Sequence, residues 1–428
     1  MRRLVLPLLL AGLATGVAAP AAPSAWAAWA RDVDDADDGD VGAAARAGQW
    51  QLGALRLPEA WRTSRGEGVV VAVLDTGVNA HHPDLEGAVI PGPDLTDTPA
   101  PDARSADARA TDGSPADTDA STAPTSMTVA GSDGGEAWGP HGTAMASLIA
   151  GHGHGDGRKG GVLGVAPAAK VLSVRVTLEN GDPMRGKQRS GWRDALAKGI
   201  RYAADQGADV ISMSLGGGSG AWEGSAAEEE AVQYAIGKGA VLVASSGNDG
   251  ESGNRKNFPA AYPGVIAVGA VDRRLAVAGF SNRQDYVSVV APGTEIVTAD
   301  GADSYVVGDG TSSAAAMVAG VAALIRSAHP AMSPYHVRMA IELGTRRRPS
   351  DGYSPAYGHG VANALLALRA AARLDVPAAG LSRPGPYFGD GPAPVSRMAV
   401  VAGMLLLALG MSARVMLRQG PERERDST

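Results

Sequence analysis

The sequence lacks cysteine altogether. This absence excludes a disulfide framework, a thiol nucleophile and a thiolate-bound metal, and it leaves stability to the packing of the core. A long basic stripe is lacking too, because most of the 38 Lys and Arg residues are scattered along a chain of net charge −7. Without a basic stripe to bind phosphates, we expect no nucleic-acid partner. The length of 428 residues allows one large domain or two of ordinary size.

Residues 1–30 have the pattern of a secretory signal peptide. Two arginines follow the first methionine, residues 4–13 form an apolar centre, and small side chains near residues 25–30 offer a cleavage site. We therefore expect export, with an uncleaved N-terminal anchor as the alternative. Residues 31–49 form an acidic, alanine-rich extension that we expect to be disordered. Residues 49–61, QWQLGALRLPEAW, are interpreted as a short helical entry that packs onto the main domain.

Residues 310–320, GTSSAAAMVAG, place a serine at the start of a helical run of small side chains. Small side chains let a helix pack deep in a core, and its N-terminus presents free N–H groups and a partial positive charge. Ser312 is therefore a candidate nucleophile, but it needs a base to take its proton and a third group to orient that base. The alternative is that Thr311 or Ser312 merely caps a core helix.

Two other stretches supply the base and the orienting group. Residues 69–78, VVVAVLDTGV, read as a buried strand that ends in Asp75, and open α/β sheets keep their sites at the C-terminal ends of strands. Residues 141–151, HGTAMASLIAG, put His141 just ahead of an apolar helical pattern. Asp, His, Ser is one of three known chain orders of the catalytic triad, and it is the subtilisin order.

On the motifs DTG, HGT and GTS, in that order and each on its expected element, the chain resembles the subtilisin family of serine proteases. The resemblance covers roughly residues 50–375 and includes FPAAYPGVIAVGAVD at 258–272, where Phe258-Pro259 is a candidate for the family's cis peptide. It implies an α/β fold with a largely parallel sheet flanked by helices on both faces. It also implies hydrolysis of peptide bonds through an acyl-enzyme, with Asp75, His141 and Ser312 as the triad.

The resemblance assigns roles to further residues. Asn248 matches the family's oxyanion asparagine, although Gly-Asn-Asp-Gly read alone would suggest only a turn. Residues 214–216 match the segment that pairs with the backbone of the substrate, and they are Ser214, Leu215 and Gly216. The nucleophile motif departs from the family pattern in two places. Ala316 replaces a usual proline and Ser313 a usually larger residue, and neither change removes a group that the reaction needs.

Two further histidines precede Pro83 and compete with His141 for the role of base. His81 and His82 follow Asp75 on a turn where the family often has His-Pro, so we interpret both as parts of a surface turn.

Family members often bind calcium in the loop that corresponds to residues 151–161. Here that loop has one carboxylate, Asp156, with two cationic side chains beside it, whereas calcium needs several oxygen ligands. His152 and His154 without further ligands do not make a transition-metal site. We expect no metal and no cofactor.

Residues 92–135 form an insert between Asp75 and His141, with hardly any apolar side chain larger than alanine. A loop of this length without secondary structure is either functional or disordered, and its position places it beside the cleft.

The C-terminal part reads as a membrane anchor. Residues 376–397 are a Pro/Gly-rich linker, and residues 398–413 carry no charge between two arginines. At ~1.5 Å per residue this run is slightly short of a ~30 Å hydrocarbon core, but flanking arginines can reach the interface. We expect a single transmembrane helix, with residues 414–428 as a cytoplasmic tail, and a buried core helix as the alternative.

This layout of signal peptide, short extension, protease domain with a long insert, linker and anchor resembles the mycosins. Those are membrane-anchored subtilisin-like proteases associated with type VII secretion, and they often have disulfides, which this chain lacks. The resemblance implies a protein or peptide substrate, a site on the outer side of the cell membrane, and a type VII secretion membrane complex as partner. The extension is too short to be a chaperone-like propeptide. The alternatives are a generic cell-surface subtilase and a non-catalytic scaffold of a secretion complex.

Overall fold

The computed structural model describes residues 38–96, 132–133, 136–180, 182, 185, 191–216, 224–301 and 303–374. The chain divides into two units, residues 1–375 and 376–428, and the described residues all lie in the first. The expected signal peptide, linker, transmembrane helix and cytoplasmic tail lie outside the described residues, as does most of the insert.

A nine-stranded sheet forms the centre of the domain, in the order β14-β15-β11-β10-β9-β8-β1-β7-β2. Every neighbouring pair in it is parallel except β14 with β15 at one edge. The strands of this sheet are β1 (Val70–Asp75), β2 (Val89–Ile90), β7 (Lys170–Arg175), β8 (Val210–Met213), β9 (Val241–Ser245), β10 (Ile266–Val271), β11 (Val287–Pro292), β14 (Thr345–Arg346) and β15 (Val361–Ala362).

The central strands are nearly continuous apolar runs because helices cover both of their faces. Parallel sheets buried on both sides read this way rather than as an alternation of polar and apolar residues. In β8, β9, β10 and β11 every residue is buried. The fold class expected from the sequence is therefore confirmed, and the Phe258-Pro259 peptide bond is cis as expected.

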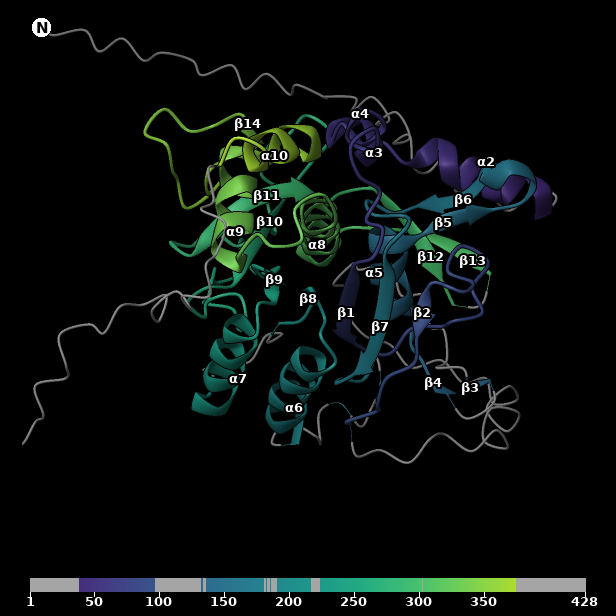
Figure 1. The fold of residues 1–428 in the computed structure, drawn as a ribbon, viewed down its shortest axis with the longest axis horizontal. Helices are drawn as coiled ribbons and strands as arrows, with labels where there is room; N and C mark the ends of the chain where they lie inside the picture. Colours follow the sequence, from purple (N-terminus) through teal and green to yellow (C-terminus); the bar gives the residue numbers. More distant parts are fainter. Residues whose placement is uncertain are drawn as a thin grey trace, which may run out of the picture. The chain divides into compact units, whose positions relative to one another are not determined.

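The helices form the two outer layers, as Figure 1 shows. On one side of the sheet lie α6 and α7, and on the other lie α5 and α8, with α9 and α10 packed beside α8. Their bounds are α5 (Pro140–Ala150), α6 (Gly191–Asp205), α7 (Ala226–Gly237), α8 (Thr311–Ala328), α9 (Pro334–Leu343) and α10 (Ala364–Ala371).

Helix α8 runs through the middle of the domain, where small side chains let it approach the sheet closely. Ala314, Ala315 and Ala316 are all fully buried, so alanine in place of the family's usual proline leaves the helix continuous from Thr311. Among the described residues it is also the one helix long and apolar enough to cross a membrane, but 78% of it is buried inside the protein. It is a core helix.

The N-terminal extension is partly helical, contrary to the disorder that its composition suggested. Helix α2 (Asp38–Gly48) buries Ala45 against Val162 and Val297, and Arg46 hydrogen-bonds to a distant hairpin. The acidic composition suggested disorder, but most of the acidic residues lie earlier in the sequence than the residues of α2 that make these contacts. The short helices α3 (Gln51–Ala54) and α4 (Leu57–Ala60) follow, as expected for the entry into the domain.

The first residues of the expected insert at 92–135, up to residue 96, contact β7. The backbone N–H of Leu95 donates to the carbonyl of Arg175 at 2.8 Å, and the carboxylate of Asp94 pairs with the guanidinium of the same residue at 2.7 Å. These contacts extend the sheet edge beyond β2. At the other end, β3 (Ser132–Asp133) pairs with β4 (Glu136–Ala137).

Two small hairpins complete the described fold. One joins β5 (His152–His154) to β6 (Gly160–Leu163) through a short 3-10 turn, η2 (Asp156–Arg158). The other joins β12 (Ile296–Asp300) to β13 (Ser304–Gly308). Both lie near α2 (Figure 1).

Candidate active site

The residues singled out in the sequence gather at one edge of the sheet. Asp75 is the last residue of β1, residues 214–216 leave β8, and Asn248 follows β9. Because these strands are neighbours and parallel, their C-terminal ends meet at the same edge. His141 and Ser312 are each the second residue of a helix, α5 and α8, that packs against that sheet.

Asp75 and His141 form a hydrogen-bonded pair. Oδ1 of Asp75, a fully buried residue, accepts from Nδ1 of His141 at 2.7 Å and from the backbone N–H of Thr76 at 2.8 Å. Its Oδ2 has no partner among the described residues. A proton held on Nδ1 by the carboxylate leaves the lone pair of Nε2 free, which is the tautomer that a general base needs.

The charges around His141 favour its protonated form. Burial by itself lowers the pKa of the imidazole, because it penalises the cation. The carboxylate of Asp75, with its hydrogen bond, and that of Glu179 outweigh burial and the guanidinium of Arg185, so the pKa of His141 is raised. A raised pKa means that the free base is lost at a higher pH than for an isolated histidine as the solution is acidified.

Ser312 and Ser214 are joined by a reciprocal pair of hydrogen bonds. Oγ of Ser312 donates to the carbonyl of Ser214 at 3.3 Å, and Oγ of Ser214 donates to the carbonyl of Ser312 at 3.0 Å. The candidate nucleophile therefore rests against the end of β8 rather than on His141. Contacts between a nucleophile and its base often form fully only when substrate is bound.

The side chain of Asn248 is oriented by the start of α8. Its Oδ1 accepts from the backbone N–H of Thr311 at 2.9 Å and from the hydroxyl of the same residue at 2.8 Å. With the oxygen held there, the NH₂ group faces the other way. Nδ2 of Asn248 and the backbone N of Ser312 border one small space, since both would lie 3.7 Å from a Cβ built on Gly310.

The segment 214–216 is fixed by hydrogen bonds from the end of β9 and from the loop that follows β9. The carbonyl of Leu215 accepts from Oγ of Ser245 at 3.0 Å and from Nδ2 of Asn257 at 3.4 Å. The side chain of Asn257 also fills the space where a Cβ on Gly216 would stand. The backbone of this segment thus lies at the end of the sheet with its position fixed.

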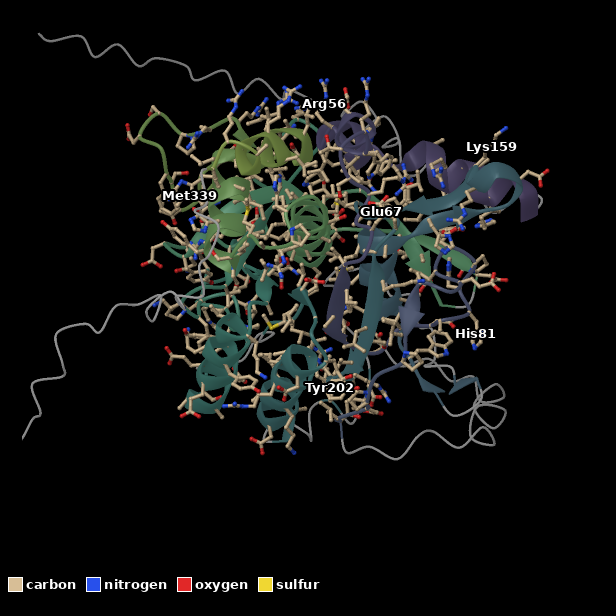
Figure 2. All side chains as sticks on the ribbon, in the orientation of Figure 1. Arg56, Glu67, His81, Lys159, Tyr202 and Met339 are labelled. Carbon is tan, nitrogen blue, oxygen red and sulfur yellow. The ribbon has the colours of Figure 1, made fainter. Side chains whose placement is uncertain are left out.

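The structure brings His141, and neither of the other two histidines, to Asp75. His81 is exposed at the edge of the molecule, as Figure 2 shows and as expected. The expectation of a surface turn was wrong for His82, which is fully buried, with Nε2 3.3 Å from the carbonyl of Ser304 on β13. Burial lowers the pKa of His82. The partner is far away in sequence, so no local pattern could show it.

Glu179 is a residue of this site that the sequence analysis missed. Its Oε1 accepts a hydrogen bond from the backbone N–H of His141 at 2.9 Å. No motif marks it. The one available signal was its place just beyond the end of β7, which neighbours β1.

In the hairpin at residues 151–161, two backbone carbonyl groups accept hydrogen bonds from an arginine. Nε of Arg46 donates to the carbonyl of Gly161 and Nη2 to that of Gly160, each at 2.8 Å. Next to them, the buried carboxylate of Asp84 accepts from Nδ1 of His154 and from the backbone N–H of Val162, both at 2.7 Å. Within the described part of the chain, no three acidic or histidine side chains gather as metal ligands.

We expect stability to be independent of calcium, since the Arg46 guanidinium already supplies positive charge to the carbonyls of this hairpin. The thermal midpoint of the detergent-solubilised full chain should be the same in millimolar calcium and in chelator. Calcium at 100 times its dissociation constant would add about 2.7 kcal/mol, and a midpoint raised by several degrees would therefore reveal a site. Arg46→Ala should lower the midpoint equally in both solutions.

Comparison with known proteins identifies the family. The Peptidase_S8 subtilase family matches residues 66–360. Thermitase of Thermoactinomyces vulgaris is 35% identical over 67% of this chain and 85% of its own length. Subtilisin E of Bacillus subtilis is 35% identical over 70% of this chain and 65% of its own.

Solved structures of mycosins are also similar. MycP1 from Mycobacterium smegmatis is 27% identical, with a TM-score of 0.56 over 74% of this chain and 84% of that one. The MycP3 protease from the type VII (ESX-3) secretion system is 28% identical, with a TM-score of 0.57 over 78% and 89%. The arrangement of Asp75 and His141 at the sheet edge and the extent of these matches lead to one conclusion: the chain belongs to the subtilase family of serine endopeptidases.

Proposed function

We propose that this protein is a membrane-anchored serine endopeptidase of the mycosin type, with Asp75, His141 and Ser312 as its catalytic triad. The observation that carries the proposal is the 2.7 Å hydrogen bond between Asp75 and Nδ1 of His141, at the sheet edge that also holds Asn248 and the start of α8. Each group needed for acyl transfer is then present in the described part of the chain.

The reaction begins when Oγ of Ser312 leaves the carbonyl of Ser214 and turns towards Nε2 of His141. Oγ attacks the carbonyl carbon of the substrate while Nε2 takes its proton, and Asp75 stabilises the resulting imidazolium. Negative charge collects on the substrate oxygen, where Nδ2 of Asn248 and the N–H of Ser312 donate to it.

The tetrahedral intermediate collapses when His141 returns the proton to the leaving amine. The C–N bond breaks, and the acyl group stays on Ser312 as an ester. Water then attacks the ester with His141 again as base, releasing the carboxylic acid and restoring the serine hydroxyl.

The substrate peptide binds along residues 214–216 as an additional strand. Its backbone pairs with the backbone of Ser214 and Gly216, which β8 delivers to the sheet edge. The side chains of Asn257 and Ser245 donate hydrogen bonds to the carbonyl of Leu215. Because these bonds already fix the segment, it does not have to become ordered when the substrate binds.

A fluorophosphonate tests the catalytic proposal directly, because it reacts with a serine that a neighbouring base has activated. The folded protein should become labelled at Ser312, and His141→Ala should prevent the labelling. A protein that stays unlabelled while binding a secretion complex would instead favour the non-catalytic scaffold.

The mycosin assignment rests on two supports. The first is the likeness to MycP1 and MycP3, and the second is the sequence layout with a peptidase domain at 50–375, a linker at 376–397 and an apolar run at 398–413. We place the protease domain outside the cell membrane, with residues 414–428 in the cytoplasm. Its substrates would be proteins of a type VII secretion system. A generic cell-surface subtilase is the alternative.

The proposed topology predicts the outcome of protease shaving. A flexible linker of about twenty residues reaches ~25 Å, so the cleft stays near the bilayer and meets emerging substrates at high effective concentration. Shaving intact cells should remove the catalytic domain and spare a tag fused after Thr428. Loss of the tag, or full-length protein in the culture medium, would contradict this topology.

A further inference from the structure

The carboxylate of Glu179 lies at the N-terminus of α5, the helix that carries the histidine of the site. It accepts the backbone N–H of His141 at 2.9 Å. The helix has no side-chain cap of its own, because Gly139 stands at its N-cap, and Pro140 has no N–H to satisfy. Glu179, on the segment that follows β7, supplies the missing acceptor from another part of the chain.

A second side chain holds the same turn of α5. The hydroxyl of Thr76 accepts the backbone N–H of Gly142 at 3.0 Å. A Cβ at Gly139 would stand 2.5 Å from Oε1 of Glu179 and would overlap the Thr76 hydroxyl, so only glycine leaves room for both. Side chains that follow two neighbouring strands, β1 and β7, thus fix the backbone on which His141 sits.

His141 lies in the first turn of α5, where the helix dipole disfavours the positive charge of its imidazolium form. A helix N-terminus bears a partial positive charge, which disfavours a cation there. The imidazolium forms in the proposed reaction, so a compensating negative charge is needed. Asp75 supplies one carboxylate and Glu179 a second, and together they outweigh burial and raise the pKa of His141.

Two other charged groups face this corner of the site. The guanidinium of Arg185 acts against the protonation of His141, and its Nη1 donates to the carbonyl of Leu178 at 2.7 Å. Asp300 lies at the end of β12, and burial together with the negative charge of Glu179 raises the pKa of Asp300. Glu179 is the member of this group that directly contacts the histidine backbone.

We propose that Glu179 is a positioning residue for the general base. It holds the first turn of α5 through the N–H of His141, and its charge offsets the helix dipole as the imidazolium forms. The inference rests on the proposed role of His141 as base, and it adds a fourth residue to the three that the sequence motifs indicate.

Glu179→Gln separates charge from hydrogen bonding, because the amide oxygen still accepts the N–H of His141. Without the charge the imidazolium is less stable, so kcat should fall by about three- to thirtyfold. The acid limb of kcat/KM should move to lower pH, since His141 then loses its proton more readily. At one pH unit below the wild-type midpoint, the retained fraction of plateau kcat/KM should rise roughly two- to fivefold.

Glu179→Ala removes both the charge and the acceptor. It should show the same movement of the acid limb and a further loss in kcat, because the turn that carries His141 is no longer held. The matched control is Asp156→Asn, which removes one carboxylate from the exposed hairpin turn and should leave the pH profile unchanged. The assay uses the detergent-solubilised full chain with a chromogenic peptide, and Ser312→Ala is measured in parallel.

The outcomes distinguish this inference from the proposed function. If Ser312→Ala abolishes hydrolysis but Glu179→Gln has the wild-type acid limb, the role of Glu179 is refuted and the triad stands. If Ser312→Ala remains active, the triad itself is wrong. A loss of kcat in Glu179→Ala alone, with wild-type kcat and acid limb in Glu179→Gln, would indicate a purely structural role and overturn the proposal.

Discussion

Ser312→Ala is expected to lower kcat for peptide hydrolysis by ~10⁶-fold, the effect that loss of the nucleophile has in subtilisin. The protein should remain folded, because within the described part of the chain the hydroxyl makes one hydrogen bond, to the carbonyl of Ser214 at 3.3 Å. The return bond, from Oγ of Ser214 to the backbone of residue 312, survives the change. Alanine also suits the first turn of a helix at least as well as serine does in intrinsic propensity.

The neighbouring Ser313→Ala is the matched control. Ser313 is 7% exposed and lies in the same helical turn, so its substitution reports on packing alone. We expect near wild-type kcat for this variant and full labelling by a fluorophosphonate. Hydrolysis or labelling that persists in Ser312→Ala, or that disappears equally in both variants, would contradict the role of Ser312.

The three motifs that we propose as the triad could be recognised in the sequence because each is local. An apolar strand that ends in an aspartate, a glycine-flanked histidine before a helix, and a serine before a run of alanines each place one side chain at one end of one element. Asp75 and His141 then meet because Asp75 ends β1 and His141 begins α5, the helix that packs against that strand. For these three motifs, local sequence patterns suffice to place each side chain on its element, and no information about distant contacts is needed.

What the sequence did not reveal depends on contacts between distant segments. Arg46 reaches a hairpin 114 residues away, and His82 is buried near a carbonyl 222 residues away. In both cases local composition suggested exposure or disorder, and burial by a remote strand decided the outcome. Glu179 belongs to the same class, since its partner is the backbone of His141, 38 residues earlier, and backbone contacts leave no pattern in the sequence.

Asn248→Ala is expected to lower kcat by ~10²–10³-fold with little change in KM, as loss of an oxyanion donor does in subtilisin. The donor acts on charge that develops in the transition state, so its removal affects kcat rather than ground-state binding. The variant also loses the acceptor for Thr311, which Oδ1 of Asn248 contacts twice, at 2.9 and 2.8 Å. A lower kcat could therefore arise from a displaced helix start as well as from a missing donor.

Asn248→Asp separates these two causes. Aspartate keeps an oxygen that accepts from the N–H and the hydroxyl of Thr311, so the start of α8 stays anchored. It lacks the NH₂ donor, however, and places a negative charge in the space beside Gly310 where the oxyanion would form. If Asn248 stabilises the oxyanion, Asn248→Asp should be at least as inactive as Asn248→Ala while unfolding at the wild-type temperature. If its function is only to anchor Thr311, Asn248→Asp should retain wild-type kcat, because the anchoring contacts are intact and the donor would not matter.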